Sequence, residues 1–61
     1  MSNQELAKKM RRVRKHMLEN AARWERLAVI ENDPLWLTSA ADARVHAQYY
    51  LERLRELKGA A

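Results

Sequence analysis

Asn32-Asp33-Pro34 decides the fold of this 61-residue chain, because no other strong helix breaker lies between residues 3 and 58. Proline has no backbone N–H and disfavours helical geometry in the residue before it, so a helix cannot continue through Pro34. The same residues suit the start of a new helix, with Asp33 as N-cap and Pro34 at the first helical position. The sequence therefore predicts an all-α antiparallel hairpin, with helices over residues 3–31 and 34–58 and a turn at residues 32–34.

The outer ends of this hairpin also carry helix signals. Ser2-Asn3-Gln4-Glu5 fits a capping box at the start of the first helix, and Gly59 after Lys58 is typical of a helix end. Ser39-Ala40-Ala41-Asp42 reads as a second capping box, which leaves open a later start for the second helix, with residues 34–38 as a short turn. Ala60-Ala61 is expected to fray.

Apolar residues recur on both predicted helices at alternating steps of four and three, the spacing of a heptad seam. The seam of the first helix is Leu6, Met10, Val13, Met17, Asn20, Trp24 and Leu27, and that of the second is Trp36, Ala40, Ala43, Ala47, Tyr50, Leu54 and Leu57. A pivot near residue 33 would bring Trp24 level with Ala43, so that a large residue faces a small one.

Asn20 is the polar exception in the first seam. A single buried Asn can fix the register or the oligomeric state of packed helices. Alternatively, a small rotation of the helix places Ala21 in the seam and turns Asn20 to solvent. The sequence leaves both arrangements open.

The size of the chain predicts one domain, residues 1–61, that is only marginally stable alone. A chain this short buries roughly 60% of the surface that its unfolded form exposes. It has no cysteine, and His16 and His46 show no ligand spacing, so we predict no disulfide, metal site or cofactor. No stretch reaches the roughly 18 apolar residues of a membrane span. A cytoplasmic protein without membrane contact is expected.

Apolar residues outside the two seams predict self-association, because two helices cover only one stripe of each other. The economical arrangement is a homodimer that forms an antiparallel four-helix bundle. The predicted oligomer interface comprises Leu18, Val29, Leu37, Ala41, Val45, Tyr49 and Leu51.

The most distinctive stretch is the basic block at residues 8–16, which holds six cations and no acid. The net charge of +4 divides unevenly, since residues 1–30 carry eight cations and three acids, whereas residues 31–61 carry four and five. Such a block is the electrostatic footprint of binding to nucleic-acid phosphates or to an acidic protein surface. The candidate contact residues are Lys8, Lys9, Arg11, Arg12, Arg14 and Lys15. Alternatively, this face is solvated and pairs across the hairpin with Glu52 and Glu56.

The sequence contains no recognisable catalytic constellation. His46 follows Asp42 by four residues, so the two can touch on a helix, but no nucleophile accompanies them. Two helices do not make a cleft for a small-molecule substrate. We therefore predict a non-enzymatic helical interaction module that self-associates and binds a protein partner; the alternative is a small nucleic-acid-binding protein.

Overall fold

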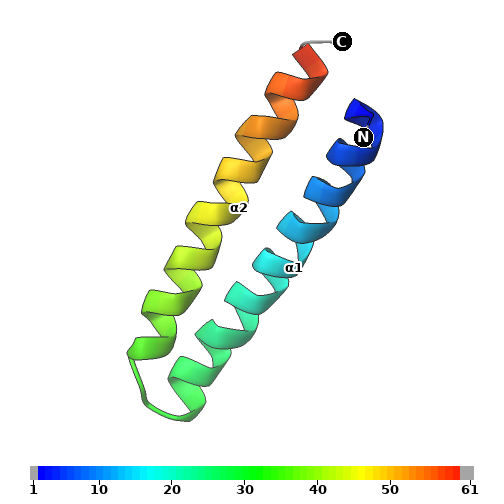
Figure 1. Cartoon of the computed structure of the whole chain (residues 1–61). Coiled ribbons are helices and arrows are strands. Elements are labelled where there is room, and N and C mark those ends of the chain that lie inside the picture. Colours follow the sequence, from blue (N-terminus) through cyan, green and yellow to red (C-terminus); the bar gives the residue numbers. More distant parts are fainter. Residues whose placement is uncertain (1, 60–61) are drawn as a thin grey trace.

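The computed structural model describes residues 2–59, which form a two-helix antiparallel hairpin (Figure 1). Helix α1 spans Asn3–Ile30 and helix α2 spans Leu35–Gly59, so the predicted fold class is confirmed and both helices lie within one residue of their expected bounds. The hairpin is a narrow rod with extents of 46 × 14 × 12 Å. The expected fraying of residues 60–61 falls outside the described residues.

The turn between the helices is closed by backbone hydrogen bonds. The N–H groups of Asn32 and Asp33 donate to the carbonyls of Val29 and Ala28 at 3.3 and 3.1 Å, which is the bonding pattern of a Schellman motif. Asn32 has a φ of 53°, in the left-handed region that this motif requires and that Asn tolerates better than most residues. The fold therefore reverses at Asn32 without leaving these end groups of α1 unpaired.

Asp33 starts the second helix, as predicted. Its Oδ1 accepts a hydrogen bond from the Leu35 N–H at 3.0 Å. The alternative start is wrong, because Ser39 lies inside the continuous helix α2. At the other end of the chain, Ser2 caps α1 by accepting a hydrogen bond from the Glu5 N–H at 3.2 Å. Both helices therefore begin at side-chain caps that the sequence identified.

A side-chain contact also spans the turn. The indole Nε1 of Trp36 donates to Oε2 of Glu31 at 2.6 Å. Because Glu31 caps the end of α1 and Trp36 lies in the first turn of α2, this bond ties the two helices together where the chain reverses.

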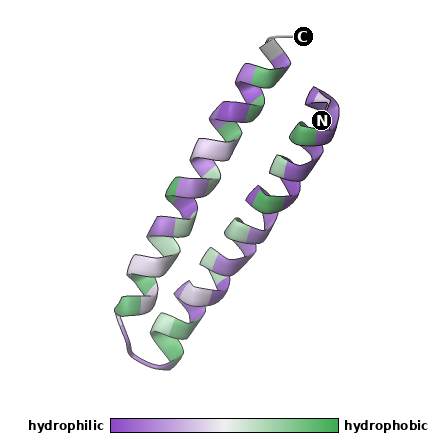
Figure 2. Cartoon of the chain, in the orientation of Figure 1, coloured by the Kyte–Doolittle hydropathy of each residue, from purple (hydrophilic) through white to green (hydrophobic). Residues whose placement is uncertain are grey.

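The seam of α2 agrees with the prediction. Ala40 and Ala47 are almost fully buried, and the other five residues of this seam are half-buried. Trp24 and Ala43 line the same shallow hollow, as expected for residues at one level of the hairpin. Figure 2 shows that α1 is amphipathic, with hydrophobic residues turned towards α2 and hydrophilic residues on the outer side.

The seam of α1 is only partly as predicted. Met10 is buried and Met17 is half-buried, but Leu6 and Val13 are each 37% exposed. Ala21 is fully buried and takes a place in the seam, as the rotated arrangement expects, but Asn20 is half-buried and not turned fully to solvent.

Small residues explain this rotation. Ala21 and Ala28 are both buried and, counting from the turn, lie level with the buried Ala47 and Ala40 of α2. Side chains of this size let two helix backbones approach closely, so the packed line follows the alanines rather than the larger Val13.

Candidate functional site

The predicted oligomer interface is largely exposed. Val29 is 81% exposed, Val45 66%, Tyr49 55% and Leu37 51%, and Ala41 is also exposed. The remaining two residues, Leu18 and Leu51, are half-buried. The hairpin therefore leaves an apolar surface available for interaction.

Four of these exposed residues form a continuous stripe on α2. Leu37, Ala41, Val45 and Tyr49 are spaced four residues apart, so they follow one side of the helix, off the line of the buried Ala40 and Ala47. The ring of Tyr49 packs edge-on against that of Tyr50, with 5.9 Å between the ring centroids. We call residues 37, 41, 45 and 49 the outer stripe.

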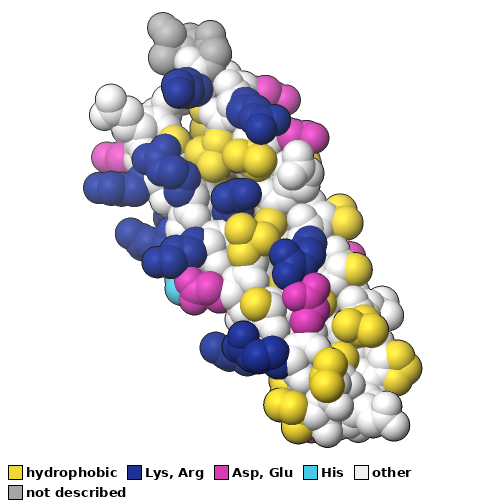
Figure 3. Space-filling model, turned by 180° about the vertical axis from the view of Figure 1, so that it is seen from behind, with side chains coloured by type: hydrophobic (Ala, Val, Ile, Leu, Met, Phe, Trp, Pro, Cys, Tyr) yellow, Lys and Arg dark blue, Asp and Glu magenta, His cyan; other side chains and the backbone are white. Residues whose placement is uncertain are grey.

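The turn end carries further exposed apolar residues that were absent from the predicted interface. Ile30 is 76% exposed and Leu35 is 72% exposed, and both flank the turn beside Val29 and Leu37. Figure 3 shows hydrophobic side chains gathered at this end of the molecule. The sequence indicated the exposure of these two residues only through their positions, since Ile30 lies off the seam and Leu35 directly follows Pro34.

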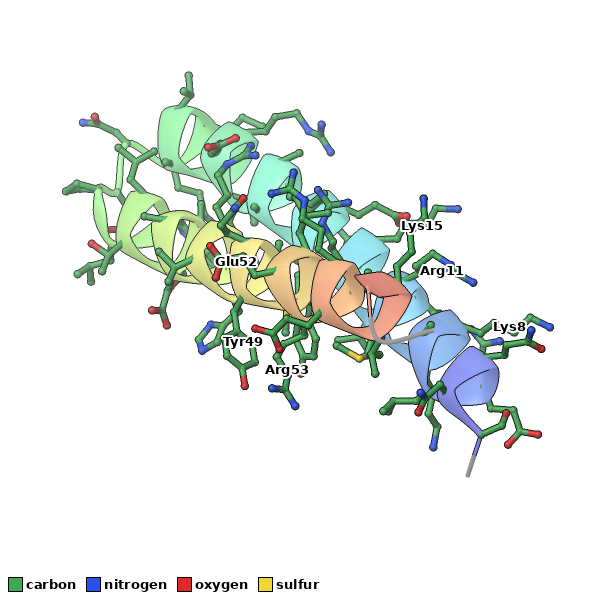
Figure 4. The ribbon with its side chains drawn as sticks, turned by 90° about the horizontal axis from the view of Figure 1, so that it is seen from above. Lys8, Arg11, Lys15, Tyr49, Glu52 and Arg53 are labelled. Atoms are coloured by element: carbon green, nitrogen blue, oxygen red, sulfur yellow. The ribbon has the colours of Figure 1, made fainter. Side chains whose placement is uncertain are left out.

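The six candidate cations lie along the N-terminal half of α1. Lys8, Arg11 and Lys15 project from one side of the hairpin, whereas Tyr49 and Arg53 of α2 lie on the opposite side (Figure 4). Lys8, Lys9, Arg11, Arg12 and Lys15 are exposed. Among the side chains that the structure describes, none of these cations forms an ion pair. The basic block therefore presents uncompensated positive charge to solvent.

Arg14 differs from the other five cations because it is half-buried beside the seam. Its Nε is buried and has no hydrogen-bond partner among the described residues. The long aliphatic stem of an arginine can cover apolar surface while its charged tip reaches water. Arg14 therefore belongs in part to the packing of the hairpin.

The acids of α2 do not neutralise the basic block, contrary to the alternative weighed from the sequence. Glu56 pairs with Arg53 on its own helix, with Nη1 and Oε2 3.2 Å apart. Within the described residues, Glu52 forms no ion pair. Across the hairpin, Arg44 instead donates from Nη2 and Nε to the two carboxylate oxygens of Glu25 at 2.6 and 3.1 Å.

This bidentate contact changes the titration of both partners. The hydrogen bonds from Arg44, with a smaller contribution from its charge, lower the pKa of Glu25 below its ordinary value of 4.5 despite some desolvation. The same hydrogen bonds and charge raise the pKa of Arg44. The contact joins α1 to α2 in the half of the rod nearer the turn.

His46 contacts the backbone of its own helix. His46 Nδ1 lies 2.9 Å from the backbone carbonyl oxygen of Asp42, not from its carboxylate, so the ring donates to a main-chain oxygen. No group of three or more His, Cys, Asp or Glu side chains within residues 2–59 is arranged to hold a metal ion. No helix in this range is both long enough and apolar enough to cross a membrane.

Comparisons with known proteins leave the function to be argued from these surfaces. The chain matches no protein-family model, no curated protein and no solved structure.

Proposed function

We propose that this protein is a non-enzymatic helical interaction module that self-associates through its outer stripe and binds a protein partner. The observation that carries the proposal is the amount of surface that the hairpin leaves exposed. The accessible area is 4954 Å² for a chain of 7.2 kDa. A compact monomer of this mass exposes about 4100 Å².

The difference, about 800 Å² per chain, equals the area that each partner contributes to a standard protein–protein interface. The core of the single hairpin is correspondingly thin. Its buried residues are Met10 and four alanines, and no large side chain in the described part of the chain is fully buried. A second copy packed on the outer stripe would supply the missing apolar contacts and give a four-helix bundle.

Sedimentation equilibrium of the full chain between about 10 and 500 µM tests this proposal. We expect the mass of a homodimer to dominate at the upper concentrations. A double variant, Leu37→Glu with Val45→Glu, should be monomeric, because it places charges in the centre of an apolar contact. Both positions are exposed in the hairpin, so the variant keeps its helices.

His16→Glu is the matched control, since it places an acid at an exposed position on the other helix. It should associate like the unaltered protein. A single-hairpin mass at the highest concentration contradicts the proposal, as does a double variant that remains dimeric.

A second candidate function, nucleic-acid binding, is favoured by the unpaired cations of the basic block. Five exposed cations within two and a half turns of α1 match the requirements of a phosphate-backbone contact. The logarithm of the affinity for a generic duplex DNA or RNA should then fall with the logarithm of the salt concentration, with a slope that reports several released counterions.

Arg12→Ala with Lys15→Ala should reduce the magnitude of that slope by about two, because each lost phosphate contact removes roughly one released counterion. Arg53→Ala, on the opposite side of the hairpin, should leave it unchanged. Absence of binding at low salt removes this candidate and leaves the first one untouched.

A further inference from the structure

The two helices leave an apolar groove between them at the open end of the hairpin, away from the turn. Its volume is about 430 Å³, and its walls are the first turns of α1 and the last turns of α2. Ala7, Leu51, Leu54 and Leu57 supply its apolar lining, and all four are half-buried. The hairpin alone therefore leaves three leucines partly in water at this end.

Cations flank the groove on both sides. Arg11 lines it from α1, and Arg55 and Lys58 line it from α2. All three are exposed, none is in an ion pair within the described residues, and no acid is among the residues that line the groove. In Figure 3, the hydrophobic patch near the C-terminal end of α2 is bordered by Lys and Arg side chains.

We propose that this groove docks a short acidic amphipathic helix of a protein partner. The inference rests on the proposed function as an interaction module and names the site and the class of the partner. The lining residues occupy about two turns of each wall, or about 12 Å. That length matches the apolar stripe that a helix presents at positions i, i+3, i+4 and i+7 when it lies in a groove.

The placement of charge favours this occupant over the other anionic ligands. Because the cations stand on both walls, the ligand they complement has acidic groups on both flanks of its apolar stripe, as an acidic amphipathic helix has. A fatty acid offers a single carboxylate. Nucleic acid offers no apolar face to cover Leu51, Leu54 and Leu57. A second copy of this chain carries a net charge of +4 and would bring like charge to the groove.

A model peptide tests the proposal directly. The probe is a fluorescein-labelled 18-residue peptide with leucines at helical spacing and glutamates elsewhere, titrated with the full chain and followed by fluorescence anisotropy. We expect a dissociation constant in the micromolar range. A peptide of the same composition, with its leucines scrambled out of register, should bind at least about tenfold more weakly, because it cannot align one apolar stripe with the groove.

Charge reversal at the edge of the groove provides the second test. Arg55→Glu with Lys58→Glu should weaken binding of the probe at least about tenfold, because the variant repels the acidic flanks of the peptide. Arg23→Glu with Arg26→Glu is the matched control, since it changes the net charge equally at exposed positions outside the groove. It should alter the affinity less than about twofold. Circular dichroism confirms that both variants keep the helices.

Three results overturn the proposal: no binding of the probe up to about 1 mM, equal binding of the scrambled peptide, or equal effects of the two charge reversals. Binding of dodecanoate or of duplex DNA, without binding of the probe, likewise assigns the groove to another ligand if Arg55→Glu with Lys58→Glu abolishes it. Sedimentation of the same samples separates this outcome from self-association. A monomer that binds the probe contradicts the proposed dimer and supports the groove. A dimer that does not bind the probe supports the dimer and contradicts the groove.

Discussion

Arg14 is the residue at which local chemistry and packing conflict most clearly. It lies between Met10 and Met17 at a position that faces α2, and its buried Nε has no hydrogen-bond partner within the described chain. A buried donor without a partner costs more than an apolar atom in the same place. An arginine at this point contributes its aliphatic stem to the packing, at the cost of that unpaired donor.

Arg14→Met should therefore stabilise the hairpin by about 1 kcal/mol, because it keeps the unbranched stem and removes the unpaired donor. Urea unfolding followed by circular dichroism at neutral pH measures the change. Arg12→Met, at an exposed position on α1, should stay within about 0.5 kcal/mol of the unaltered protein. A destabilised Arg14→Met variant would show that the guanidinium tip makes a stabilising interaction in solution.

Glu25 makes the stability of the hairpin dependent on pH. Its pKa is lowered in the folded state by the hydrogen bonds and charge of Arg44. A lowered folded-state pKa gives stability that is fully present above the unfolded value of 4.5 and is lost as the pH falls through the folded value. Glu25→Gln should melt at a lower temperature than the unaltered protein at pH 7. The gap should close as the pH falls below the lowered folded-state pKa of Glu25, because both side chains are then neutral. A gap that is unchanged at acidic pH would assign the effect to packing and not to the ion pair.

The turn shows how a single backbone angle controls an element. Asn32 has a φ of 53°, and the hydrogen bonds that end α1 depend on that left-handed geometry. Asn32→Ala should destabilise the hairpin by about 1 kcal/mol, whereas Asn32→Gly should be neutral or stabilising, because glycine has no Cβ to clash at positive φ.

Asn20, in the middle of α1, is the matched control for this turn. At a helical φ the order reverses, and glycine should be less stable than alanine by about 1 kcal/mol. Thermal melts of the four variants, alanine and glycine at each position, measure these differences in stability. If the alanine and glycine variants had the same order of stability at both positions, the left-handed geometry of Asn32 would not govern the turn.

The helices themselves were predictable because their limits depend on local chemistry. Ser2, Asp33 and Pro34 fix helix ends through their own side chains and backbone, and these signals are present in the sequence. The seam of α1 was less predictable, because hydrophobic type alone favours Val13 over Arg14 and gives little weight to Ala21. Only the packed pair shows that close approach of the alanines decides the rotation.

The exposed apolar surfaces were partly predictable for a related reason. The spacing of Leu37, Val45 and Tyr49 placed them away from the seam, and they are exposed as expected. The open-end groove could not be read from the sequence, since Leu54 and Leu57 are correctly assigned to the seam of α2. They line a groove because the α1 residues beside them there are the small Ala7 and the polar Asn3, Gln4 and Arg11.

At the scale of the whole molecule, a thin rod should be weakly stable as a single copy when its described part buries only five small or medium residues. If folding and association are coupled, the melting temperature must depend on protein concentration, because mass action favours the associated state. A hundredfold rise in concentration, from about 5 to 500 µM, should raise the melting temperature by roughly 10 °C for a homodimer of this size. The Leu37→Glu, Val45→Glu variant should melt at a lower temperature that does not depend on concentration. Identical melting temperatures for the unaltered protein across that range would mean that the hairpin is stable without a second copy, and that its exposed stripe is kept for a different partner.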